Sequence, residues 1–123
     1  MEMSWTILIT DDNKIIRNIV RLILENQGHA VFEAVNGLDA LSKVNECHPD
    51  LIIMDVMMPE MDGLTACKNI KSNEATAKVP IVILSANTSA QNKASGYEAG
   101  AEMYLEKPVV PALLNETICN ILS

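Results

Sequence analysis

Four short apolar runs in this chain each lead into a residue that can carry chemistry. Buried parallel strands have continuous apolar sequences of this kind, and ligands of open α/β sheets bind beyond the carboxyl ends of the strands. The runs and the residues that follow them are 7–9 before Asp11 and Asp12, 51–54 before Asp55, 81–84 before Ser85, and 103–105 before Lys107 and Pro108. We therefore expect three carboxylates, a hydroxyl and an ammonium group to meet at one edge of a parallel sheet.

The segments between these runs have apolar residues at helical spacing. A further strand near residues 30–34 completes five β/α units, which right-handed crossovers fold into a parallel sheet covered on both faces. The expected helices span residues 13–27, 37–46, 64–72, 88–100 and 111–122. Gly28 should cap the first helix, and the fourth should be the least stable because it is rich in Ser, Asn and Gly. The sequence predicts a doubly wound α/β fold.

Length, charge and cysteine spacing limit the class of protein. The 123 residues fit one domain, 1–123, and no apolar run approaches the roughly 18 residues of a membrane span. A formal charge of −7 argues against direct binding to nucleic acid or to an anionic membrane. The three cysteines lack metal-type spacing and the N-terminus carries no secretion signal, so we expect a cytoplasmic protein with reduced thiols.

Three acidic residues at the expected sheet edge predict a metal site. Asp11, Asp12 and Asp55 would repel one another and raise each other's pKa values unless a cation joined them. Hard oxygen ligands without nearby His or Cys favour Mg²⁺, which keeps several waters and takes one or two protein carboxylates. We therefore expect Mg²⁺ at this edge.

A hydroxyl and an ammonium group at the same edge indicate phosphoryl transfer, which depends on positioning and on neutralising charge. Asp55 would be the nucleophile that forms an acyl phosphate. Its phosphoryl oxygens would be held by Mg²⁺, by Lys107, and by the Ser85 hydroxyl together with the backbone amide of Ala86.

Short motifs around these residues form a pattern that covers essentially the whole chain. They are Asp11-Asp12, Asp55 within Ile-Ile-Met-Asp-Val-Met-Met-Pro, Asp62-Gly63, Ser85-Ala86, Gly100-Ala101 and Tyr104-Leu105-Glu106-Lys107-Pro108. The pattern resembles the receiver domains of two-component response regulators, particularly chemotaxis-regulator-like ones. The resemblance implies a flavodoxin-like fold with strand order 2-1-3-4-5. It also implies a signalling domain rather than a turnover enzyme, in which Asp55 accepts phosphate from a sensor histidine kinase or histidine phosphotransfer protein.

The resemblance implies a ligand set and a backbone geometry for the site. The Mg²⁺ ligands would be Asp12, Asp55 and the Met57 carbonyl, with Asp11 acting mostly through water. The Lys107–Pro108 peptide would be cis, which an X–Pro bond permits at low cost in free energy.

Further residues match the switching and hydrolysis positions of the family. Ser85 and Tyr104 match the switch pair, in which Tyr104 turns inward when Ser85 moves toward the phosphoryl group. Met57 and Asn87 match positions that tune hydrolysis. An apolar Met could shield the phosphate from water and Asn could orient a water, so the two residues act in opposite directions.

Two surfaces are expected to meet partners. Phosphorylation should bias the loosely built fourth helix, so this helix, the fifth strand and the fifth helix would form an output surface toward an effector domain or protein. Lys14, Arg17 and Arg21 make a basic stripe along the first helix beside the acidic residues. The stripe is either a plain solvated face or a docking strip for the phosphohistidine domain of the kinase.

Three other functions stay open at this point. A Mg²⁺-dependent aspartate-nucleophile phosphatase of the haloacid dehalogenase type needs a second acid two residues after the nucleophile, where this chain has Met57. A flavodoxin-like cofactor carrier needs a Ser-, Thr- or Gly-rich phosphate loop, but residues 10–13 read Thr-Asp-Asp-Asn. A receiver that acts as a phosphate-independent interaction module would need a hidden fault in the site geometry.

Overall fold

Five parallel strands form one sheet in the order β2-β1-β3-β4-β5. The structure is a computed structural model that describes residues 4–123. The strands are β1 Thr6–Thr10, β2 Ala30–Ala34, β3 Leu51–Met54, β4 Ile81–Ser85 and β5 Met103–Glu106, and the helices are α1 Lys14–Asn26, α2 Gly37–Cys47, α3 Gly63–Ser72, α4 Ala90–Glu98 and α5 Pro111–Leu122. The predicted doubly wound fold and its strand order are confirmed.

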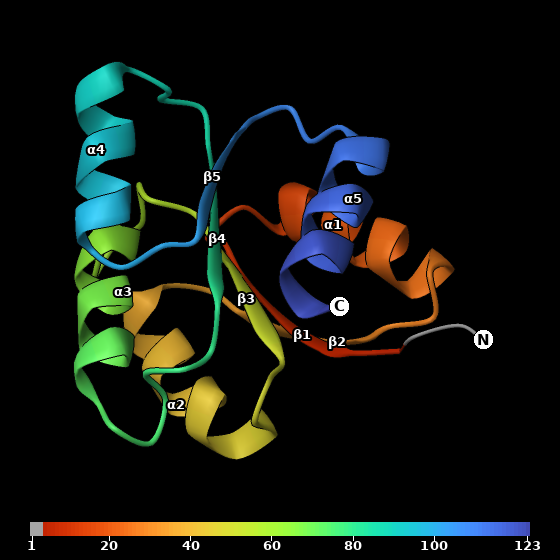
Figure 1. Cartoon of the computed structure of the whole chain (residues 1–123), viewed down its shortest axis with the longest axis horizontal. Helices are drawn as coiled ribbons and strands as arrows, with labels where there is room; N and C mark the ends of the chain where they lie inside the picture. Colours follow the sequence, from red (N-terminus) through yellow and green to blue (C-terminus); the bar gives the residue numbers. More distant parts are fainter. Residues whose placement is uncertain (1–3) are drawn as a thin grey trace.

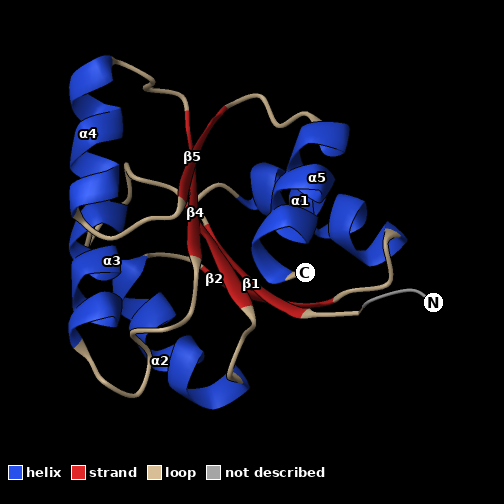
Figure 2. Ribbon diagram, in the orientation of Figure 1, coloured by secondary structure: helices blue, strands red, loops and turns tan. Residues whose placement is uncertain are grey.

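The helices cover both faces of the sheet (Figures 1 and 2). Helices α1 and α5 lie on one face, and α2, α3 and α4 lie on the other. In β1, Ile7 and Ile9 pack in one buried cluster with Leu24 of α1 and Ile118 of α5, whereas Leu8 belongs to the cluster on the opposite face. Covering both faces explains why the inner strands β3 and β4 are buried along their whole length and almost entirely apolar. Within residues 4–123, no helix combines the length and apolar character needed to cross a membrane.

The first helix ends at Asn26, just before Gly28, the glycine that the sequence predicted to cap it. Gln27 is the capping residue, and Gly28 follows it with a φ angle of 88°. The backbone N–H groups of Gly28 and His29 donate to the carbonyls of Glu25 and Leu24, at 2.9 and 3.2 Å. Glycine adopts this left-handed conformation without steric penalty, and the two hydrogen bonds satisfy carbonyls at the helix end.

Helix α4 is shorter than the predicted range 88–100. Ser89 ends the preceding loop, and its side chain caps the helix by accepting a hydrogen bond from the Asn92 backbone N–H at 3.2 Å. Gly96 is the only buried residue of α4. The helix therefore rests on the sheet through a narrow contact, which favours the prediction that it is the least stable helix.

That contact is made by Gly96 against the ring of Tyr104 on β5. A Cβ atom at position 96 would lie 2.8 Å from Tyr104 Cδ2 and 3.0 Å from Ile83 Cδ1, closer than side chains normally approach. Tyr104 is buried, and its hydroxyl donates a hydrogen bond to the carbonyl of Asn87 in the β4–α4 loop. The absence of a side chain at Gly96 thus lets Tyr104 lie inward beneath α4. The movement of Tyr104 on phosphorylation stays a prediction.

Gly96→Ala should displace the Tyr104 ring. The substitution ordinarily favours a helix by about 1 kcal/mol, but overpacking costs about 1–3 kcal/mol, so we expect a lower free energy of unfolding in urea. The chain has two tyrosines, so 3-fluorotyrosine labelling gives two ¹⁹F resonances, which Tyr97→Phe assigns. The Tyr104 resonance should move toward that of an exposed ring.

Ser95→Ala is the matched control, because it adds helix propensity one residue away without placing a new atom against the ring. A Gly96→Ala protein that is stabilised as much as Ser95→Ala, with an unchanged Tyr104 resonance, would contradict this packing.

Candidate functional site

Three carboxylates meet at the carboxyl edge of the sheet. Asp11 and Asp12 follow β1, and Asp55 follows β3, which pairs directly with β1. One oxygen atom from each residue lies within 4.8 Å of the other two. Asp11 and Asp55 are buried, whereas Asp12 is exposed. The fold therefore brings together the acidic cluster that the strand ends predicted.

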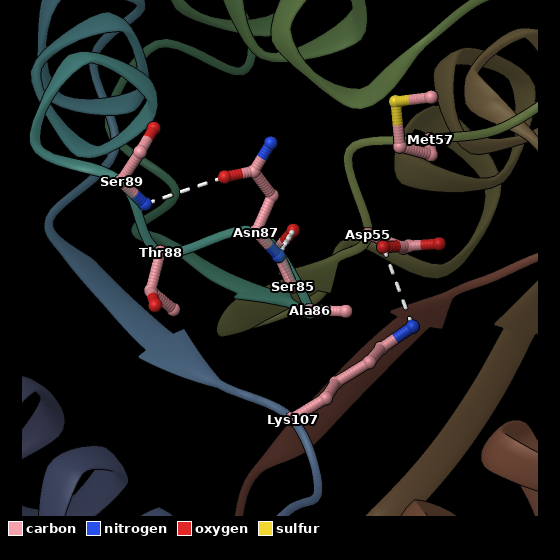
Figure 3. A pocket seen from close by; sticks show the side chains of 8 residues that line it. All are labelled: Asp55, Met57, Ser85, Ala86, Asn87, Thr88, Ser89 and Lys107. Carbon is pink, nitrogen blue, oxygen red and sulfur yellow. Dashed lines mark hydrogen bonds and ion pairs between the residues drawn. The ribbon is translucent and has the colours of Figure 1, made fainter.

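Lys107 brings a positive charge to this cluster from the end of β5. Its Nζ atom lies 2.8 Å from Asp11 Oδ2 and 3.3 Å from Asp55 Oδ1, and Figure 3 shows the side chain extended toward Asp55. The backbone N–H of Lys107 donates to the Ser85 carbonyl at 2.9 Å, which ties the end of β5 to the end of β4. The Lys107–Pro108 peptide is cis, as the resemblance implied.

Burial and charge shift the pKa values of Asp55 and Lys107. Burial, and then the negative charge of Asp11, raise the pKa of Asp55 more than Lys107 and the Val56 N–H lower it. Burial lowers the pKa of Lys107, but hydrogen bonding to Asp11 and the charge of Asp55 outweigh burial and raise it above its ordinary value. Lys107 is thus an ammonium at neutral pH. It offsets one of the three negative charges of the cluster.

The oxygen atoms of the cluster differ in how they are engaged. Asp11 Oδ1 accepts the Asn13 backbone N–H at 2.9 Å, and Oδ2 pairs with Lys107. Asp55 Oδ1 accepts the Val56 N–H at 2.9 Å and also faces Lys107, which leaves Oδ2 without a hydrogen bond to any described residue. Within residues 4–123, the Asp12 carboxylate has no hydrogen bond or ion pair.

This donor set fits a magnesium ion. The cluster consists of carboxylates alone, without His or Cys, and hard oxygen ligands of this kind suit Mg²⁺. Asp12 and the second oxygen of Asp55 are free to ligate, whereas both oxygens of Asp11 are engaged within the protein. This difference favours the prediction that Asp12 and Asp55 are direct ligands and that Asp11 acts mostly through water.

Gly63 fixes the backbone of Asp55 against the start of α3. A Cβ atom at position 63 would lie 1.9 Å from the Asp55 carbonyl oxygen, so a larger residue would force the two segments apart. The Gly63 N–H donates to the Val56 carbonyl at 2.9 Å. Asp62 caps α3 by accepting the Thr65 backbone N–H at 2.8 Å. These contacts position the β3–α3 loop, which carries Met57.

A pocket of about 550 Å³ opens beside Asp55 (Figure 3). Its lining residues come from the ends of β3, β4 and β5: Asp55, Met57, Ser85, Ala86, Asn87, Thr88, Ser89 and Lys107. The Ser85 hydroxyl accepts the Asn87 backbone N–H at 3.1 Å, and the Asn87 side chain accepts the Ser89 N–H at 3.3 Å. The predicted nucleophile, ammonium, hydroxyl and hydrolysis residues therefore line one pocket.

Thr88 and Ser89 also line this pocket, although their sequence positions did not predict it. The available signal was the run of hydroxyl and amide residues that begins at Ser85. Ser85 and Asn87 of this run were predicted as site residues, whereas Thr88 and Ser89 fell in the predicted helix 88–100, because the sequence does not show how far the loop folds back over the strand ends.

Two of the three residues of the predicted docking stripe have partners inside the fold. Arg17 and Arg21 both pair with Glu33 of β2, at 3.0 and 2.8 Å, and only Lys14 is exposed. Burial would raise the pKa of Glu33, but its hydrogen bonds to Arg21 and Arg17 outweigh burial and lower it. Arg21 also pairs with Glu25 at 3.0 Å. The arginines are therefore not a free basic face, and docking through them stays a prediction.

Known proteins resemble this chain over most of its length. The family described as Response regulator receiver domain matches residues 7–119. Protein PilG of Pseudomonas aeruginosa is 38% identical over 83% of this chain and 76% of its own length. The transcriptional regulatory protein ResD of Bacillus subtilis is 41% identical over 85% of this chain, which spans 42% of ResD.

Solved structures share the whole fold. The chemotaxis protein CheY4 of Vibrio cholerae superposes with a TM-score of 0.91 at 33% identity, covering 98% of this chain and 100% of CheY4. The signal receiver domain of a signal transduction histidine kinase from Syntrophus aciditrophicus gives a TM-score of 0.89 at 30% identity, covering 96% of this chain and 89% of that domain. The chain therefore belongs to the receiver domain family of two-component response regulators.

Proposed function

We propose that Asp55 accepts a phosphoryl group from a phosphohistidine, carried by a sensor histidine kinase or a histidine phosphotransfer protein. The observation that carries this proposal is the convergence of Asp55, two further acids and Lys107 beside an open pocket. Because the chain belongs to the receiver family, we propose a signalling domain rather than a turnover enzyme.

In the transfer step, a carboxylate oxygen of Asp55 attacks the phosphorus atom. The new P–O bond forms as the P–N bond to the partner's imidazole breaks, and the bonding electrons leave with the imidazole nitrogen. Asp55 Oδ1, which accepts the Val56 N–H and faces Lys107, would form the P–O bond, and the second oxygen would face the cation. Lys107 would neutralise charge on one phosphoryl oxygen, and the Ser85 hydroxyl with the Ala86 amide would bind another.

The residues that would hold Mg²⁺ are Asp12, Asp55 and the Met57 carbonyl, with Asp11 contacting it through water. When bound, the ion supplies positive charge that offsets both the repulsion among the carboxylates and the charge of the phosphoryl oxygens. Asp11 also keeps Lys107 directed toward Asp55, through the ion pair of 2.8 Å.

Two residues of the pocket would set how long the phosphoryl group lasts. Met57 is 75% exposed at the pocket opening, where its apolar side chain can cover the phosphoryl group. Asn87 lines the same pocket, where its amide can orient a water for hydrolysis. We propose that the lifetime reflects these two opposing influences.

The output would pass from the pocket to α4, β5 and α5. The Ser85 hydroxyl binds the Asn87 N–H, the Asn87 carbonyl binds the Tyr104 hydroxyl, and the Tyr104 ring contacts Gly96 of α4. A movement of Ser85 toward a phosphoryl group would therefore disturb contacts that hold α4. Because α4 has one buried residue, it is the element most easily shifted.

The partner on the output side would be an effector domain or a separate protein. We propose no direct contact with nucleic acid, because the formal charge is −7. A cytoplasmic location is proposed because Cys47, Cys67 and Cys119 are all unpaired, as is usual in reducing compartments.

Asp55→Asn should abolish phosphorylation. Treatment of the wild type with acetyl phosphate and Mg²⁺ should add one phosphoryl group, seen by intact mass spectrometry, and chelation of Mg²⁺ should prevent it. Asp62→Asn is the matched control, since it changes an acid in the same loop and Asn caps a helix as well as Asp does. Modification of Asp55→Asn at the wild-type level would reject Asp55 as the acceptor.

Phosphorylation should change backbone hydrogen exchange in the β4–α4 loop, α4, β5 and α5. The same treatment of Asp55→Asn should leave exchange unchanged, which separates the effect of phosphorylation from that of the reagent. Changes confined to α1 and α2 would refute the proposed output surface.

A further inference from the structure

Arg17 joins the acidic loop to the edge strand of the sheet. Its NH1 group donates to the Asp11 backbone carbonyl at 2.8 Å, while its Nε group donates to Glu33 of β2 at 3.0 Å. The side chain is 12% exposed, so the guanidinium is largely shielded from water. Hydrogen bonds from a charged donor in such a setting are stronger than those between neutral groups.

The carbonyl that Arg17 holds belongs to the peptide between Asp11 and Asp12. Its orientation sets the direction in which the chain leaves Asp11. The Asp11 N–H donates to the Ala34 carbonyl at 3.2 Å, and its carboxylate is held by Lys107 and by the Asn13 N–H. With Arg17 on the carbonyl, every polar atom of Asp11 has a partner.

Asp12 depends on this backbone for its position. Its side chain is exposed and has no partner within residues 4–123, so no side-chain contact directs it toward Asp55. A peptide plane free to rotate at Asp11 would let the Asp12 carboxylate leave the cluster. Metal ligands are oriented by the residues that contact them from outside the metal site.

The arginine supplies this restraint without adding net charge. Arg17, Arg21, Glu25 and Glu33 form one ion-paired group with two positive and two negative charges. Arg21 shares Glu33 with Arg17, but its remaining contacts are with Glu25 and the Val31 carbonyl, at 3.0 and 3.3 Å. Arg21 therefore provides a matched comparison, because it belongs to the same group and does not touch the acidic loop.

We propose that Arg17 is a positioning residue for the cation site, acting through the Asp11 carbonyl to hold Asp12 in place. The proposal rests on the proposed function only in requiring that the cluster binds Mg²⁺. In this proposal, Arg17 acts as a restraint inside the fold and not as a free charge on the surface.

Calorimetric titration with Mg²⁺ tests this role on Arg17→Met, Arg21→Met and the wild type, with urea unfolding of each. Both substitutions remove one positive charge and one ion pair with Glu33, so we expect similar losses in the free energy of unfolding. Arg17→Met should weaken Mg²⁺ binding about tenfold, and Arg21→Met should leave it within about twofold. Arg17→Lys keeps a donor for one of the two acceptors and should fall between.

The direction of the change separates positioning from electrostatics. Loss of a nearby positive charge alone would tighten Mg²⁺ binding, whereas loss of positioning weakens it. Equal affinities in Arg17→Met and Arg21→Met, or tighter binding in Arg17→Met, would overturn the proposal. A wild type that binds no Mg²⁺ would overturn the proposed function and this inference with it, whereas wild-type binding with equal variants overturns the inference alone.

Discussion

The structure depends on the repulsion among three carboxylates that the fold collects at one sheet edge. The parallel strands β1 and β3 end side by side, so the acidic residues that follow them lie close together. One oxygen of each acid lies within 4.8 Å of the other two. Lys107 balances part of this charge and is held in place by Asp11 and Asp55. In the proposed function, the remaining negative charge would favour binding of a divalent cation and, with that cation, of a phosphoryl group.

The same edge of the sheet connects the pocket beside Asp55 to α4, a helix with one buried residue. Ser85, Asn87 and Tyr104 form a continuous set of hydrogen bonds from the pocket to the underside of α4. Gly96 leaves the space that the Tyr104 ring occupies. A helix held by one buried residue can move for a small difference in free energy, which is consistent with the output role proposed for α4.

The sequence predicted what depends on local pattern and missed what depends on pairing across the fold. The apolar runs predicted the strands. Because Asp11, Asp55 and Lys107 each follow a strand, the sequence also predicted that they meet at one edge of the sheet. The partners of Arg17 and Arg21 were missed because Glu33 is 16 and 12 residues away in the chain and becomes a neighbour only when β2 lies beside α1. The sequence indicates only that Gly96 has a low helix propensity. Its contact with Tyr104 forms only when α4 packs on β5.

Anomalous diffraction from crystals grown with Mn²⁺, which shares the oxygen ligands of Mg²⁺, is the most direct test of the central claim. We expect one strong peak between Asp12 and Asp55, with the Met57 carbonyl in contact and Asp11 beyond direct reach. The absence of a peak at the three carboxylates, at a concentration that fills other Mn²⁺ sites in the crystal, would contradict a cation-dependent acceptor site.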